Sequence, residues 1–156
     1  MENNIQPMTY VKYTDILPND IPEEFLIRDV SIIESFENVF PDKRGAHIYG
    51  SYVAPDELQN YIQSFFSVPV LVRYQVIHSQ LPVHIDVGVD KEKYNYIYET
   101  GGDNVETRWW SSKDNDKELL HAMIVEPNHW VKFRVDIPHD ISAVESTRLS
   151  ITVREK

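Results

Sequence analysis

From residue 70 onward, hydrophobic and polar residues alternate along most of the chain with the period of two that is typical of half-buried β-strands. Eight segments show this pattern or a short β-branched run: 70–78, 83–89, 94–100, 106–112, 121–127, 130–137, 139–144 and 148–154. Turn-like clusters such as TGGDN and SSKDND separate them. Short strands at this spacing favour a β-sandwich or barrel over βαβ units.

The first 69 residues follow a different pattern. The segment APDELQNYIQSFF (54–66) carries apolar residues at spacings of three and four after a Pro-Asp start, which predicts a helix that ends before Pro69. Residues 1–50 are irregular, and we expect short strands and turns there, with one helical turn near Pro22. The chain shows no linker, so we expect a single domain, 1–156, with a mixed N-terminal segment (1–69) and a β core (70–156).

Composition narrows the classes of partner and cofactor. The formal net charge of −10, with scattered Lys and Arg, argues against binding to nucleic acid, since that affinity depends largely on basic residues. We see no apolar run long enough for a membrane helix and no signal peptide, so we expect no membrane partner. The absence of cysteine excludes disulfides, cysteine-ligated metals and a thiol nucleophile. Any metal must therefore bind to His, Asp or Glu.

The segment LPVHIDVGVD (81–90) places two polar side chains together on an apolar strand. His84 and Asp86 are two residues apart, so they should lie on the same face. In RLSITVR (148–154), Arg148 and Ser150 share one face, and the apolar residues share the other. Either the apolar face packs in the core and Arg148 meets water, or Arg148 points into the interior of a barrel.

His139 lies nine residues before Arg148 and fifty-three after Asp86. Two imidazoles and one carboxylate can occupy one face of an octahedral metal ion, as in non-haem Fe(II) sites. An arginine that points inward beside such a metal needs an anion, because a buried unpaired guanidinium is costly. Together these residues suggest a dicarboxylate that chelates the metal at one end and pairs with arginine at the other.

The residues HID, followed by WVKFRVDIPHDISAVESTRLSIT, resemble the Fe(II)- and 2-oxoglutarate-dependent oxygenases, especially small prolyl-hydroxylase-like and aspartyl-hydroxylase-like members of bacteria and phages. The resemblance covers about residues 70–154. It implies a double-stranded β-helix (jelly-roll or cupin-like) fold and a dioxygenase that hydroxylates an unidentified small molecule or peptide. The implied cofactors are Fe(II) and 2-oxoglutarate, with ascorbate as a candidate addition, and the implied location is the cytoplasm of a bacterium or a phage-infected host cell.

The resemblance also implies roles for individual residues. His84, Asp86 and His139 match the iron ligands that form the catalytic centre. Arg148 matches the residue that binds the distal carboxylate of 2-oxoglutarate, and Ser150 supports that carboxylate. Tyr74, ten residues before His84, matches a tyrosine that hydrogen-bonds to the cosubstrate, although the Gly-rich features usual between these two points are absent.

Several alternatives stay open at this point. His121, thirteen residues before Arg134, is a rival distal ligand; we favour His139 because Arg134 and Lys132 alternate with apolar residues and should point outward. His47, His78 and His129 are further histidines without an indicated role. Tyr96 and Trp109 are candidates for the pocket lining, with Tyr96 as a possible cosubstrate contact. The rival functions are a non-catalytic cupin-like module that binds a metal or small acid, and a phage structural or interaction protein.

Overall fold

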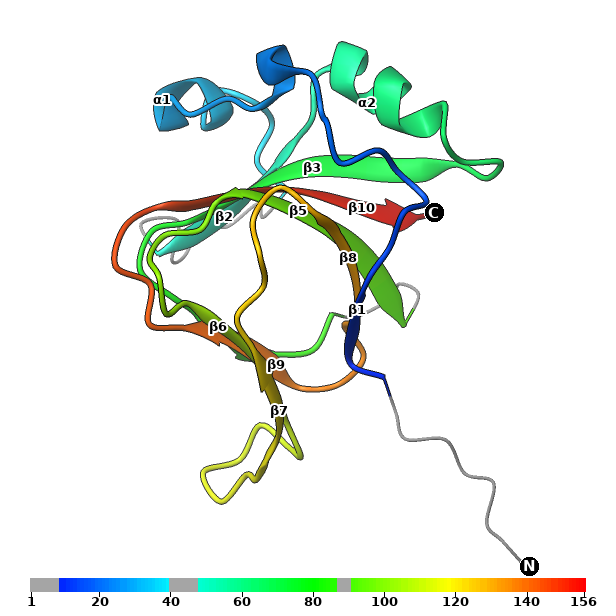
Figure 1. Ribbon diagram of the computed structural model, residues 1–156. Coiled ribbons are helices and arrows are strands. Elements are labelled where there is room, and N and C mark those ends of the chain that lie inside the picture. Colours follow the sequence, from blue (N-terminus) through cyan, green and yellow to red (C-terminus); the bar gives the residue numbers. More distant parts are fainter. Residues whose placement is uncertain (1–8, 40–47, 87–90) are drawn as a thin grey trace, which may run out of the picture.

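The computed structural model describes residues 9–39, 48–86 and 91–156, which form two stacked antiparallel β-sheets (Figure 1). The six-stranded sheet has the order β1-β8-β5-β10-β3-β2. Its strands are β1 (Val11–Tyr13), β8 (Trp130–Arg134), β5 (Glu92–Glu99), β10 (Arg148–Glu155), β3 (Val70–Ile77) and β2 (Tyr49–Val53). The four-stranded sheet has the order β4-β9-β6-β7. Its strands are β4 (Leu81–His84), β9 (His139–Ser142), β6 (Glu106–Trp110) and β7 (Leu119–Met123).

The strand order confirms the predicted fold class. Strands β3 to β10 divide into two four-stranded sets, β8-β5-β10-β3 and β4-β9-β6-β7, which is the arrangement of an eight-stranded jelly roll. All eight predicted strands are present, with ends that differ by a few residues. The predicted strand 83–89 corresponds to β4 at 81–84, and its positions 87–89 lie outside the described residues.

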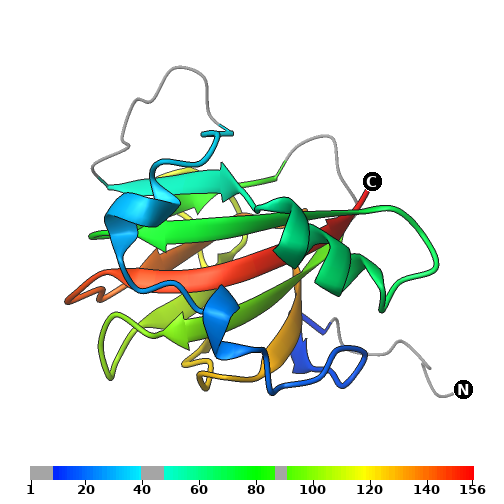
Figure 2. The ribbon, with the colours of Figure 1, turned by 90° about the horizontal axis from the view of Figure 1, so that it is seen from above.

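The N-terminal third supplies both edge strands of the larger sheet, β1 and β2, and the helices that cover its outer face (Figures 1 and 2). These helices are the 3-10 turn η1 (Glu23–Phe25), α1 (Val30–Ile33) and α2 (Asp56–Gln63). The helix predicted at 54–66 is therefore α2, shorter at both ends. In the described part of the chain, no helix is long and apolar enough to cross a membrane.

The six-stranded sheet has two different faces because its side chains alternate. The face toward the helices is apolar: Val72, Tyr74 and Ile151 pack there with Leu58 and Ile62 of α2 in one buried cluster. The face toward the smaller sheet is mixed. Arg148, Ser150 and Thr152 of β10 are buried on this inner face, so the prediction that Arg148 points into the interior is confirmed.

Candidate metal centre

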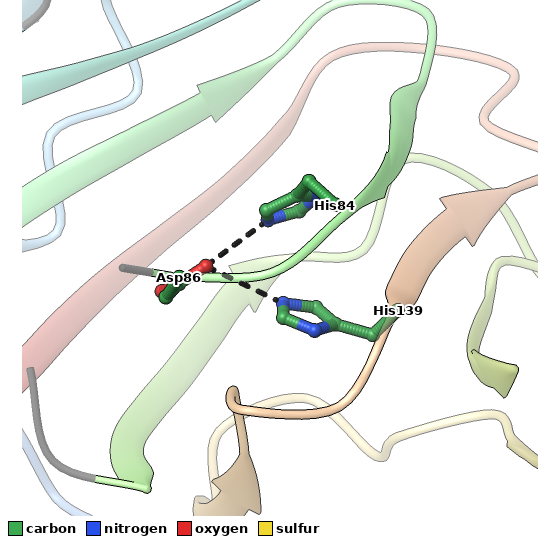
Figure 3. Close-up of side chains that lie close together, drawn as sticks. All are labelled: His84, Asp86 and His139. Carbon is green, nitrogen blue, oxygen red and sulfur yellow. Dashed lines mark ion pairs between the residues drawn. The ribbon is translucent and has the colours of Figure 1, made fainter. Parts of the chain in front are cut away.

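Two neighbouring strands and the segment after β4 bring the predicted metal ligands together (Figure 3). His84 is the last residue of β4 and His139 is the first residue of β9, and the two are direct partners in the antiparallel ladder. Asp86 follows two residues after His84, where its backbone N–H donates to the carbonyl of Val135 at 2.9 Å. Strand pairing and this backbone hydrogen bond therefore fix the three side chains on one spot.

The geometry of the three side chains suits a metal ion. The Asp86 Oδ1 atom lies 3.2 Å from His84 Nε2 and 3.6 Å from His139 Nε2. One ligand atom from each of the three residues lies within 4.8 Å of the others. Ligands about 2.1 Å from a metal and at right angles are about 3 Å apart. Small side-chain adjustments are therefore enough for all three to reach one ion.

Hydrogen bonds set the tautomer of both histidines. His84 Nδ1 lies 2.7 Å from the carbonyl oxygen of Pro82, and His139 Nδ1 lies 2.6 Å from that of Ile137. A carbonyl oxygen only accepts, so each Nδ1–H must donate. Each Nε2 then carries its lone pair toward Asp86, which is the tautomer that a metal ligand needs.

The electrostatics of the site keep His139 and Asp86 in their metal-binding protonation states at neutral pH. Burial, together with the neighbouring imidazole of His84, lowers the pKa of His139 to about 4. Burial alone would raise the pKa of Asp86, but its contact with His84 and the charge of Lys93 outweigh burial and hold that pKa well below its usual value. His139 is therefore neutral and Asp86 is ionised.

A cavity of about 270 Å³ adjoins the triad and is unusually rich in positive charge. Lys93, Arg73 and Arg154 line it from the inner face of the six-stranded sheet. Lys93 Nζ and Arg154 Nη1 lie 3.7 and 3.9 Å from Asp86 Oδ2. The two carboxylate oxygens thus have different surroundings: Oδ1 faces the imidazoles and Oδ2 faces the cations.

Arg148 and Ser150 lie on the same inner face as the cavity, but Arg148 does not line it. Arg148 borders a second cavity, of about 280 Å³, beside Thr100 and Val105. Its Nη1 donates to the carbonyl of Thr100 at 3.4 Å, and its Nη2 is buried without a partner in the described part of the chain. Burial lowers the pKa of Arg148 to about 10. The Ser150 hydroxyl lies 3.5 Å from Oε1 of Gln75, a residue that lines the triad cavity.

The tyrosines with a predicted site role lie on the opposite face of the sheet. Tyr74 donates to the carbonyl of Phe25 at 2.7 Å, and Tyr96 donates to that of Asn19 at 2.6 Å, both under the helices. This placement corrects the expectation that their hydroxyls reach the cavity. The physical reason is that side chains alternate between the two faces of a strand, and each tyrosine lies on the face that carries the apolar residues. Trp109 is also buried away from the cavity lining and donates through Nε1 to the carbonyl of Arg134.

The rival histidines do not join the triad. His121 stacks on Tyr10, with ring centroids 5.6 Å apart, at the far end of the smaller sheet. His78 lies 3.6 Å from Glu34, and His129 Nδ1 lies 2.8 Å from the carbonyl of Pro127. His47 lies outside the described residues.

The predicted outward direction of two further cations agrees with their ion pairs. Lys132 Nζ lies 3.7 Å from Glu92, and Arg134 Nη2 lies 2.7 Å from Asp136. Neither side chain lines the triad cavity.

Sequence reasoning missed three residues of the cavity, Arg73, Lys93 and Arg154. The alternation of side chains between the two faces of each strand could have identified them. Arg154 is six residues after Arg148 and therefore on the same face, and Arg73 lies directly opposite the inward Thr152 in the ladder. Lys93 alternates with Tyr94 and so shares the polar face of β5.

Comparisons with known proteins find distant structural neighbours and no family. No family model matches the chain, and no curated protein matches it. Among solved structures, one from a study of the Mn(II) centres of Bacillus subtilis oxalate decarboxylase aligns with 6% identity and a TM-score of 0.49 over 80% of this chain and 29% of that chain. A structure of the same enzyme at pH 4.6 aligns with 6% identity and a TM-score of 0.48, over 80% and 28%. The jelly-roll assignment rests on the strand order described above.

Proposed function

We propose that the protein is an Fe(II)- and 2-oxoglutarate-dependent oxygenase of the hydroxylase type. The observation that carries this proposal is the convergence of His84, Asp86 and His139 beside a cavity, with both Nε2 atoms presented by their tautomers. Two histidines and one carboxylate leave three metal positions open, and this donor set is the one that non-haem Fe(II) oxygenases use.

The chemistry comes from the bound groups, and the protein supplies position and protection. When bound, Fe(II) and 2-oxoglutarate would supply oxidative chemistry with O₂ as the oxidant: one oxygen atom would enter succinate as 2-oxoglutarate loses CO₂, and the other would hydroxylate a substrate C–H bond. The chain keeps His139 neutral and Asp86 ionised, and the carbonyls of Pro82 and Ile137 hold the imidazoles in place. Lys93 and Arg154 hold the second oxygen of Asp86, so that Oδ1 is left for the metal.

Arg148 supports 2-oxoglutarate as the cosubstrate. Arg148 is 2% exposed as a residue, and its Nη2 is buried with no partner among the described residues. Such a group is costly to bury unless an anion pairs with it. Ser150 and Thr152 follow Arg148 on the same inner face of β10; Thr152 lines the triad cavity, whereas Arg148 borders the second cavity. We assign Arg148 and Ser150 to the distal carboxylate on this basis.

Succinate formation tests the proposal without knowledge of the second substrate. Purified protein given Fe(II), 2-oxoglutarate, O₂ and ascorbate should release succinate slowly, because metal and cosubstrate can assemble without the C–H target and ascorbate can supply the two electrons that the substrate would otherwise give. The rate should fall to background in His84→Ala and in Arg148→Ala. Excess 2-oxoglutarate should partly restore Arg148→Ala, which keeps its metal site, and should leave His84→Ala inactive.

A matched control separates the site from a general effect of losing an imidazole. His129 makes the same Nδ1 hydrogen bond to a carbonyl two residues earlier as His84 does, but it lies outside the triad. His129→Ala should therefore release succinate at the wild-type rate. Equal succinate from the wild type, His84→Ala and Arg148→Ala would mean free-iron chemistry and would refute the proposal.

A further inference from the structure

Counted over the described residues, the triad cavity holds more positive charge than the proposed metal and cosubstrate need. Among the described residues that line it, Asp86 is the single carboxylate, whereas Lys93, Arg73 and Arg154 are cations. The balance of these four groups is two positive charges. A divalent metal and the dianion of 2-oxoglutarate cancel each other, so the excess persists in the loaded site.

Arg73 is the cation that most clearly needs another partner. Lys93 and Arg154 both approach Oδ2 of Asp86, but no described carboxylate forms an ion pair with Arg73. Burial, and then the neighbouring charge of Arg154, lower the pKa of Arg73. The half-buried guanidinium therefore faces a like charge and points into a cavity that Ser51 and Gln75 also line. An oxyanion placed between the two arginines would relieve this repulsion and accept hydrogen bonds from both.

We infer that the substrate to be hydroxylated carries an anionic group, a carboxylate or a phosphate, which pairs with Arg73 with help from Arg154. The cavity of about 270 Å³ limits the part that enters to a small acid or one acidic side chain. The protein as a whole has a formal charge of −10, so this positive cavity is a local feature that would concentrate small anions at the site. This inference rests on the proposed function, since it concerns the second substrate of the same site.

Binding measurements without turnover test the inference. The protein is saturated with Zn²⁺, which has no redox chemistry, and with 2-oxoglutarate. It is then titrated calorimetrically with N-acetylglycine, with methyl phosphate and with the neutral N-acetylglycinamide. Arg73→Gln is the test variant because Arg73, unlike Arg154, has no ion pair with a proposed metal ligand in the described residues. Arg28→Gln is the control, because it removes the same charge from a surface arginine paired with Glu23 and Glu99.

The expected result is that one or both anionic probes bind to the wild type and to Arg28→Gln, and bind about tenfold or more weakly to Arg73→Gln. The neutral amide should not distinguish the three proteins. Failure of both anions to bind better than the amide would overturn the inference while leaving the proposed function intact. Loss of 2-oxoglutarate binding in Arg73→Gln would also overturn it, because Arg73 would then hold the cosubstrate. Absence of Zn²⁺ or 2-oxoglutarate binding in the wild type would refute the proposed function itself.

Discussion

At the scale of single residues, Arg148 lowers the stability of the fold, whereas the proposed function requires it to bind 2-oxoglutarate. Its guanidinium is buried and only partly hydrogen-bonded within the described structure. Replacing such a group by an apolar side chain of similar length often stabilises a protein. We expect Arg148→Met to raise the free energy of unfolding by about 1 kcal/mol or more in urea denaturation. It should also weaken binding of 2-oxoglutarate to the Zn²⁺-loaded protein about tenfold or more.

A second arginine provides the comparison for this prediction. Arg108 donates to both oxygens of Asp140, at 2.9 and 2.6 Å, so its charge is satisfied. Arg108→Met should therefore destabilise the protein and leave 2-oxoglutarate binding unchanged. A loss of stability in Arg148→Met would contradict the view that its guanidinium is held in the fold at a cost.

His139 should make the metal-free protein sensitive to mild acid. Its pKa is about 4 in the folded protein, against 6.5 as the ordinary value. Between these values the unfolded chain binds a proton that the folded protein does not, so stability falls as the pH drops from about 6.5 to about 4. The full loss is of the order of 3 kcal/mol. The stabilising effect of ionised Asp86 persists through this window, because its pKa is lowered and it is protonated only under more acidic conditions.

Urea denaturation of the metal-free protein at several pH values from 7 to 4.5 measures this effect. His139→Gln should show a clearly shallower dependence on pH, since it cannot take up the proton. An equal slope in the variant would assign the acid sensitivity to other groups.

The convergence of His84, Asp86 and His139 was predicted from the sequence, and the assignment of Tyr74 to the cavity was wrong. His84 and Asp86 share a face by spacing alone, and the distal histidine was chosen because Arg134 alternates with apolar residues. Tyr74 was assigned by its distance from His84 along the chain. That distance does not show which face of the sheet a side chain lies on, because a turn separates the two strands. The alternation of Val72 and Tyr74 against Arg73 already placed this tyrosine in the apolar core.

At the scale of elements, the eight strands of the jelly roll were predicted, and the edge strands of the larger sheet, β1 and β2, were not located. β3, β5 and β10 have eight residues each, and their alternation or β-branched runs reflect a buried sheet. β1 has three residues and only one partly buried position, so its sequence carries no period to detect. Its place beside β8 depends on pairing with a strand more than a hundred residues away.

Helix α2 supplies hydrogen-bond partners to the start of β3, which does not pair with β2. The Gln59 side chain donates to the carbonyl of Val70 at 2.9 Å and accepts from the N–H of Val72 at 3.1 Å. Truncation of the Gln59 side chain would leave the Val70 carbonyl and the Val72 N–H without this partner, at a cost of about 1–3 kcal/mol in the free energy of unfolding. We expect Gln59→Ala to lower the free energy of unfolding by this amount in urea denaturation. Glu57→Ala, an exposed position on the same helix, should change it by less than about 0.5 kcal/mol.

At the scale of the whole molecule, the site is a product of the sheet order. The two histidines come from the smaller sheet, and the three cations come from the larger one. Spacing along the chain shows which residues share a strand face, but it does not show which strands are neighbours or how the two sheets face each other. The positive cavity was therefore beyond the sequence analysis, although each of its three cations lies on a predicted strand or next to one.

Ligands at this junction should stabilise the entire fold, because they bind between the two sheets and only in the folded protein. A metal at about a hundred times its dissociation constant adds about 2.7 kcal/mol to the free energy of unfolding, which corresponds to a rise in Tm of about 5–10 °C for a domain of this size.

A metal alone meets the excess positive charge of the cavity, so 2-oxoglutarate should strengthen its binding. By linkage, the metal should strengthen 2-oxoglutarate binding by the same factor. Thermal unfolding with Zn²⁺, with 2-oxoglutarate and with both should therefore show a combined rise in Tm larger than the sum of the separate ones. His84→Ala should lose the metal-dependent part, whereas His129→Ala should keep it. Strictly additive shifts in the wild type would mean that the metal and 2-oxoglutarate bind at independent places, and Arg148 would then not anchor a molecule that also reaches the triad.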